Sequence, residues 1–277
     1  MKNLLFPTDF SKPAEHAMDF AVYLAQANDS EITILHVYGS PFVDQYMTPE
    51  TISAIMHESK IKSETDIKNL KEELSVKHPW LKVNTRVEHG FVVDATLKVA
   101  EELKCDYIIM GTKGASGIFD KIIGSNTLGV IEKATCPVWA IPGSTHIKEI
   151  KTVMYATDYI GDDIAAINQI LKFSKLVGAE TKVVHFHELY EPNISDADNY
   201  RKMNLQDHFK AENISFINLN RDGVTEGIET YVENQNPNVL VLAMHKRGFW
   251  SSLFHSSTTK HFALSSKIPL LTIHKAG

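Results

Sequence analysis

The sequence predicts an α/β fold made of two tandem Rossmann-like domains, each a five-stranded parallel sheet flanked by helices. A length of 277 residues suits two domains better than one. Short apolar runs alternate with amphipathic runs along the chain, as in parallel sheets covered by helices. The chain also repeats itself, because LLFPTDF at residues 4–10 returns as VMYATDY at residues 153–159, an offset of 149.

The first copy contains five apolar runs bounded by turn residues. We expect strands at 3–6, 31–37, 82–88, 107–110 and 138–141. Helices fill the intervals. Pro13 lies in the first turn of a helix that Ser11 caps, and Pro49 opens a long helix that ends at His78-Pro79. Residues 92–103 and 125–133 form the third and fourth helices.

The second copy repeats this order with a shorter chain. Its strands are expected at 152–156, 181–186, 215–219, 239–243 and 270–274. The offset between the copies falls from 149 to smaller values later in the chain. Residues 108–110 match 242–244 at an offset of 134, and residues 136–138 match 268–270 at an offset of 132. Most of the missing length is expected after the second strand, with a further three-residue deletion in the loop after the fourth.

Two domains follow from the repeat, at residues 1–143 and 150–277, with a linker near 142–148. The repeat also predicts an intramolecular pseudo-dimer of the two domains, and repeated surfaces can support a homodimer.

Composition and charge exclude several classes of protein. Hydrophobic residues make up 43% and charged residues 22%, which is ordinary for a globular chain. The formal net charge is -6, so we expect no nucleic-acid partner and no anionic membrane. Cys105 and Cys136 are expected as buried free thiols, and the apolar runs are too short for a signal peptide or a membrane span. These features predict a cytoplasmic location.

The first candidate binding residues follow the first two strands. Ligands of open parallel sheets bind beyond the carboxyl ends of the strands, where the strand order reverses. Pro7, Thr8 and Asp9 follow the first strand, and Val37 ends the second. The Asp9 carboxylate could accept hydrogen bonds from ribose hydroxyls or an adenine amine, and the backbone of Val37 could pair with the adenine edge.

The second group lies after the fourth strand. It reads Gly111, Lys113 and Gly114, then nine residues, then Gly124, Ser125 and Asn126. Glycines let backbone amides approach a phosphate, and a helix N-terminus favours an anion. Ser125 either caps the helix or donates its hydroxyl to a phosphate, and Lys113 adds a local cation. A loop whose glycines only permit turns is the alternative, but together with Asp9 the pattern predicts a nucleotide pocket.

These residues resemble the motifs of the universal stress protein family. The Thr-Asp after the first strand, the Gly-x-x-Gly-x9-Gly-Ser pattern at Gly111, Gly114, Gly124 and Ser125, and the closing Cys-Pro-Val all match. The resemblance covers both copies and is to the tandem two-domain form. It implies ATP or a related adenine nucleotide, with or without Mg²⁺, in the first domain, and a regulatory role rather than catalysis.

The second copy departs from this pattern. His245 stands where the first glycine is expected, and His255-Ser256 stands where the first copy has Gly124-Ser125. We therefore expect no ATP in the second domain. No metal-ligand set or catalytic residues are expected from the sequence. Two other functions stay open, namely a nucleotide-independent module that binds a partner or another small ligand, and a slow ATPase.

Overall fold

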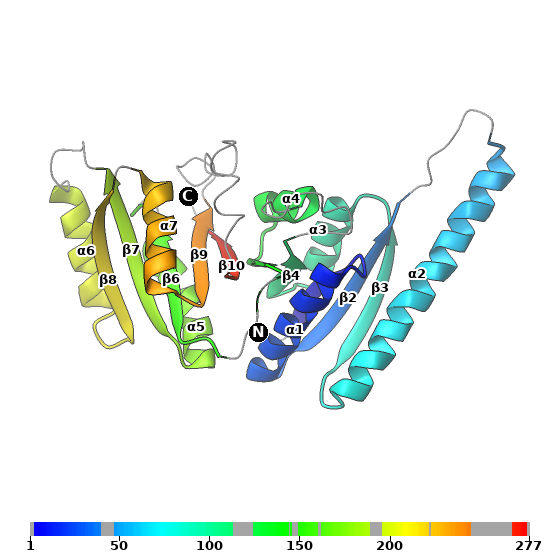
Figure 1. Cartoon of the computed structure of the whole chain (residues 1–277), viewed down its shortest axis with the longest axis horizontal. Helices are drawn as coiled ribbons and strands as arrows, with labels where there is room; N and C mark the ends of the chain where they lie inside the picture. Colours follow the sequence, from blue (N-terminus) through cyan, green and yellow to red (C-terminus); the bar gives the residue numbers. More distant parts are fainter. Residues whose placement is uncertain are drawn as a thin grey trace. The chain divides into compact units, whose positions relative to one another are not determined.

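The computed structural model describes residues 3–39, 47–112, 124–143, 145, 149–159, 162–188, 196–221, 223–244 and 268–275. The described residues up to Gly143 form one compact unit, and those from Thr145 onward form the other. Each unit holds five parallel strands with helices packed against them (Figure 1). The predicted fold class is therefore confirmed.

The strand order of the first unit creates a crevice beside its first strand. The strands are β1 (Asn3–Pro7), β2 (Glu31–Tyr38), β3 (Val83–His89), β4 (Tyr107–Gly111) and β5 (Val138–Ile141). They lie in the order β3-β2-β1-β4-β5. The chain runs outward from β1 to β3 and then crosses to the other side of β1, so the order reverses between β1 and β4. A ligand crevice forms at such a point, beyond the carboxyl ends of the strands.

Four described helices cover this sheet. They are α1 (Lys12–Asn28), α2 (Pro49–Lys77), α3 (Val92–Glu102) and α4 (Ser125–Lys133). Helix α1 packs against β1 and β4, α2 packs against β2 and β3, and α3 packs against α4. The fully buried Trp139 of β5 lies 4.9 Å from Phe20 of α1, measured between ring centroids. This apolar contact ties α1 to β5.

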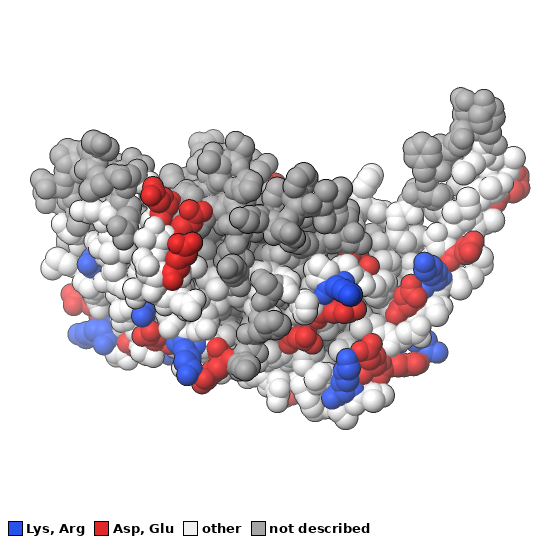
Figure 2. All heavy atoms as spheres, viewed as in Figure 1, with Lys and Arg blue, Asp and Glu red and all other residues white. Residues whose placement is uncertain are grey.

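Helix α2 is 29 residues long and largely exposed to solvent. Only Ser63, Ile67 and Leu74 are buried along it. Basic and acidic side chains alternate over its surface (Figure 2), and three pairs one turn apart lie within ion-pair distance, Lys60–Glu64, Lys68–Glu72 and Lys77–Glu73. Such exposed pairs contribute little to stability because water and salt screen them, so α2 is held mainly by its narrow buried stripe.

The second unit repeats the first around β6. Its strands are β6 (Thr152–Thr157), β7 (Glu180–Glu188), β8 (Ile214–Arg221), β9 (Val239–Met244) and β10 (Leu270–His274), in the order β8-β7-β6-β9-β10. Its described helices are α5 (Asp163–Val177), α6 (Asp196–His208) and α7 (Val224–Gln235). Helix α5 stands where α1 stands in the first unit, directly after the first strand.

The strand register corrects the match between the two copies. Leu5 pairs with Ile108, and Met154, which matches Leu5, pairs with Leu240. Ile108 is thus matched by Leu240, and the predicted match to Leu242 is wrong by two residues. β4 and β9 are both apolar along their length, so the pattern of side chains carries no register signal, and pairing with neighbouring strands decides it.

The predicted deletion in the loop after the fourth strand is also wrong. Ile108 pairs with Val138, and Leu240 pairs with Leu270, so both copies separate these partners by 30 residues. The length difference lies earlier, between the second and third strands. Val83 follows its partner Ile32 by 51 residues, whereas Ile214 follows Thr181 by only 33.

The two cysteines are free, as predicted. Cys105 is buried and Cys136 is half-buried. Burial raises the pKa of Cys105 to about 12 and the pKa of Cys136 to about 11. Both thiols are therefore protonated at neutral pH. Among the described helices, none combines the length and the apolar character that crossing a membrane requires.

We expect neither thiol to be alkylated by iodoacetamide at pH 8 while the protein is folded. The thiolate is the reactive form, and a pKa raised by burial leaves very little of it until the pH approaches 11. Intact mass after alkylation should show no added group on the native protein and two on the protein in guanidinium. Alkylation of either thiol in the native protein as fast as that of free glutathione would contradict the burial of these thiols.

Candidate functional site

A cavity of about 130 Å³ opens at the carboxyl ends of β1, β2 and β4, where the strand order reverses. Eight of the ten predicted site residues line it, namely Pro7, Thr8, Asp9, Val37, Gly111, Gly124, Ser125 and Asn126. Lys113 and Gly114 lie outside the described residues. Ala14, Leu35, Val92, Met110 and Thr127 also line the cavity. Residues from several separate segments of the first unit therefore meet around one space.

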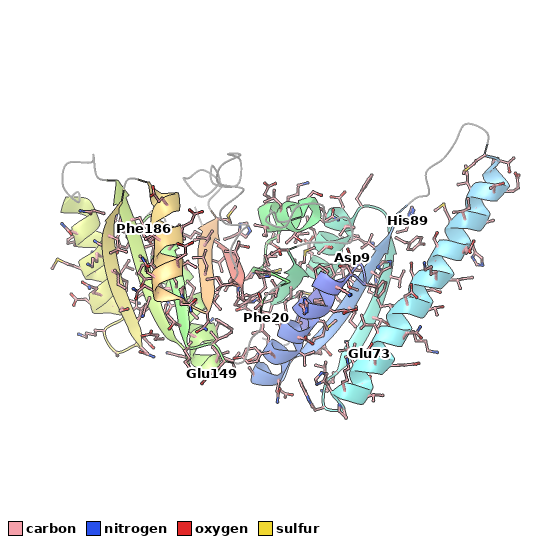
Figure 3. All side chains as sticks on the ribbon, viewed as in Figure 1. Asp9, Phe20, Glu73, His89, Glu149 and Phe186 are labelled. Atoms are coloured by element: carbon pink, nitrogen blue, oxygen red, sulfur yellow. The ribbon has the colours of Figure 1, made fainter. Side chains whose placement is uncertain are left out.

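The turn after β1 carries Asp9, which is labelled in Figure 3 and lines this cavity. The backbone N–H of Thr8 donates to the carbonyl oxygen of Leu35 at 2.8 Å, which keeps the chain beside β2. Thr8 Oγ1 then accepts from the N–H of Phe10 at 3.0 Å, and Asp9 Oδ1 accepts from the N–H of Ser11 at 3.1 Å. Phe10 adopts a left-handed backbone with φ 60°, which costs energy for an aromatic residue. These bonds hold the tight turn.

His36 supports the same turn from β2, and sequence reasoning did not identify it. Its Nδ1–H donates to the carbonyl oxygen of Thr8 at 2.8 Å, since a carbonyl can only accept. Its ring lies 4.6 Å from the ring of Phe10, between centroids. His36 thus holds both the carbonyl before Asp9 and the aromatic side chain after it. The signal was the recurrence of a histidine at the matched position 185.

The second unit builds an equivalent turn. Thr157 Oγ1 accepts from the N–H of Tyr159 at 3.0 Å, and the Nδ1–H of His185 donates to the carbonyl of Thr157 at 2.7 Å. Tyr159 has φ 55°, and its ring stacks on His185 at 4.4 Å. The strained turn is therefore a property of the repeat, and it carries Asp158 in the place of Asp9.

The N-terminus of α4 forms another part of the cavity wall. Gly124 is its N-cap residue, and a glycine has no side chain with which to cap the first-turn amides. The N–H of Gly124 donates to the carbonyl of Thr112 at 2.6 Å, and Thr127 Oγ1 donates to the carbonyl of Gly111 at 2.9 Å. These two bonds fasten the start of α4 to the end of β4. Uncapped amides and the positive end of the helix dipole face the cavity, which suits an anion.

Two capping predictions need correction. Ser11 occupies the N-cap of α1, but its side chain makes no capping hydrogen bond. Ser125 is the first helical residue of α4 rather than its cap. In α4, Gly124 occupies the N-cap position that was one of the two roles expected of Ser125.

The charge of the cavity is divided between its walls. Asp9 is the one ionisable side chain among the described lining residues, and it lies on the β1 side. The first turn of α4 contains no acidic residue. The described lining therefore combines one carboxylate with the first turn of α4. Across the described part of the chain, no three His, Cys, Asp or Glu side chains gather as a metal ion would require.

Comparison with known proteins gives consistent results. The sequence model of the universal stress protein family matches residues 1–142. A universal stress protein of Methanocaldococcus jannaschii is 31% identical over 143 residues, which are 50% of this chain and 81% of that protein. A putative universal stress protein of Staphylococcus aureus is 30% identical over 141 residues, 50% of this chain and 83% of its own.

A solved structure resembles the whole chain. The crystal structure of a universal stress protein from Archaeoglobus fulgidus covers 99% of this chain and 96% of its own, with a TM-score of 0.72 at 19% identity. At this identity the likeness shows the fold alone, and it extends the fold assignment to both units.

Replacing Thr127 by valine should destabilise the first unit. The change keeps the shape but leaves the carbonyl of Gly111 without its donor, which should lower the free energy of unfolding by about 1–2 kcal/mol. Urea unfolding measures this loss.

Thr65→Val is the matched control. Thr65 Oγ1 makes the same kind of bond, to the carbonyl of Ile61 at 2.8 Å, but on the exposed surface of α2, where water replaces the donor. Thr65→Val should lower the free energy of unfolding by less than about 0.5 kcal/mol. Equal losses in the two variants would show that the buried bond does not hold α4 to β4.

Proposed function

Because the chain belongs to the universal stress protein family, we propose that its first unit binds an adenine nucleotide, ATP in particular, and that the protein regulates rather than catalyses. The observation that carries this proposal is the convergence of β1, β2, β4 and the uncapped start of α4 on one cavity. Each wall offers the chemistry that one part of a nucleotide requires.

The parts of the nucleotide match separate walls. The backbone at Val37 suits the adenine edge, and the Asp9 carboxylate suits the ribose hydroxyls. Phosphates suit the N-terminus of α4, where Gly124 lets the ligand approach the backbone without meeting a Cβ. Mg²⁺ bound with ATP would be held by the phosphates and water, as this ion often is.

The lining residues favour binding over catalysis. Phosphoryl transfer needs a positioned base and metal ligands near the γ-phosphate. The described lining residues supply one ionisable side chain, Asp9, whose Oδ1 already accepts from the N–H of Ser11. Nucleotide occupancy would then act by changing a surface that a partner protein reads. We also propose a cytoplasmic protein without nucleic-acid or membrane partners, whose repeated domains pair with each other or with a second copy.

The purified protein should bind one ATP per chain. Titration calorimetry with ATP measures the stoichiometry, and mass spectrometry of the small molecules released by denaturation shows whether an adenine nucleotide is carried from the cell. A protein that neither carries nor binds an adenine nucleotide would overturn the proposal.

Asp9→Ala should weaken ATP binding by about 10- to 100-fold, because hydrogen bonds to a charged acceptor contribute about 1.5–3 kcal/mol. Asp19→Ala is the matched control, since this substitution removes the same charge from an exposed position on α1. Calorimetry of the two variants should separate them by at least about tenfold. Similar affinities would exclude a direct role for Asp9, and steady ATP turnover that Asp9→Ala abolishes would indicate a slow ATPase instead.

A further inference from the structure

The second unit holds a buried ion pair at the ends of its strands. Lys275, directly after β10, has a side chain with 0% exposure. Its Nζ lies 2.7 Å from Asp163 Oδ1 at the start of α5 and 3.5 Å from Asp158 Oδ1 after β6. The two carboxylate side chains are themselves only 6% and 11% exposed. An ammonium group in such a place is stable only because the carboxylates face it.

Two hydroxyl groups complete the cluster. Tyr155 OH donates to Asp163 Oδ1 at 2.7 Å, and Thr157 Oγ1 donates to the same oxygen at 2.9 Å. Burial first, and then the nearby Asp163, raise the pKa of Tyr155 well above its ordinary value, so the hydroxyl keeps its proton. The Lys275 Nζ also lies 5.8 Å from the centroid of the Tyr155 ring. Asp163 is thus surrounded by three donors.

The strand register identifies the counterparts of these residues in the first unit. Met154 matches Leu5, so Tyr155 matches Phe6 and Asp163 matches Ala14. Leu270 matches Val138, so Lys275 matches Gly143. The first unit therefore has an apolar ring, a methyl group and a glycine where the second has a hydroxyl, a carboxylate and an ammonium group.

The first unit leaves open the space that the cluster fills in the second. Ala14 lines the cavity of the first unit. A Cβ built on Gly143 would point at Pro13 and His16, with its nearest atoms at 3.8 Å, an ordinary contact. Position 143 therefore faces the first turn of α1, as Lys275 faces the first turn of α5. A side chain there would reach toward the cavity.

The carboxylate and the ammonium group among these differences are physically linked. Asp163 without Lys275 would lose the ammonium group 2.7 Å from its carboxylate, and Lys275 without Asp163 would be a buried cation that has lost the nearer of these two carboxylates. Asp158, the counterpart of Asp9, already faces this ammonium group. A nucleotide that used Asp158 as the first unit would use Asp9 would have to displace Lys275 and leave buried charges unpaired.

We propose that Lys275 is an internal ligand that closes the strand-end site of the second unit. The unit that binds a nucleotide is then decided by three pairs of matched residues, Phe6 and Tyr155, Ala14 and Asp163, and Gly143 and Lys275. The closure stands on the geometry of the second unit, while its consequence for nucleotide choice rests on the proposed function of the first.

A double-mutant cycle tests the closure without any ligand. Asp163→Ala and Lys275→Gly alone should each lower the thermal midpoint by roughly 10 °C, because each strands a buried charge. The double variant, which carries the residues of the first unit at these two positions, should recover most of that loss. A double variant that loses the sum of the two single losses would overturn the inference. The first unit of the double variant should keep the parental affinity for ATP, because its own residues are unchanged.

Transplanting the cluster into the first unit tests nucleotide choice. F6Y/A14D/G143K should weaken ATP binding by more than about 100-fold in calorimetry while the chain still unfolds cooperatively. T65D/V76K is the matched control, since it adds the same two charges at exposed positions of α2, away from the cavity, and it should bind as the parent does. A folded F6Y/A14D/G143K chain with parental affinity would overturn the inference.

The two proposals fail in different ways. A parent chain that binds no ATP defeats the proposed function, and the double-mutant cycle then still decides whether Lys275 closes the second unit. A parent chain that binds ATP, combined with additive losses in the cycle, defeats only the internal ligand.

Discussion

The pairing of β1 with β2 on one side and with β4 on the other is the constraint on which the first unit depends. It places the ends of three parallel strands together and makes the strand order reverse between β1 and β4. The chain leaves β1 toward β2 on one side and leaves β4 toward β5 on the other. The two connections therefore diverge, and a cavity forms between them. α4 then approaches the same point, since its N-terminus is fastened to the end of β4 by Thr127 and Gly124.

The same architecture occurs twice, and the two units differ in what occupies the crevice. Both have a strained turn in which a threonine hydroxyl, a histidine ring and a left-handed aromatic residue hold one another. This turn presents a carboxylate in each unit. In the first, Asp9 lines a cavity; in the second, Asp158 lies within ion-pair distance of Lys275. A shared scaffold can thus carry an open site and a closed one, because closure needs only three side chains.

Much of the first site could be predicted from the chain alone. Asp9, Val37, Gly111 and Gly124 were found because residues after parallel strands share one edge of a sheet, whatever their distance in sequence. His36 was missed because a single histidine within a strand, here between Leu35 and Val37, does not by itself indicate a contact with the turn after β1. Ile108 was matched to the wrong residue of β9 because a strand buried on both faces has no alternating pattern. An alignment of apolar residues can therefore shift by two positions and still pair apolar with apolar.

The sequence by itself determined the repeat, the α/β class and the residues at the strand ends, since apolar periodicity, helix starts and turn residues are local signals. The tertiary structure alone decided which residues of the two copies match and that Lys275 contacts the carboxylates at the strand ends of the second unit. The reason is physical: the pairing of β9 with β6 and the contact of Lys275 with Asp163 join residues far apart in the chain. A lysine near the end of a sequence indicates a solvated charge until the fold shows the buried carboxylate that holds it.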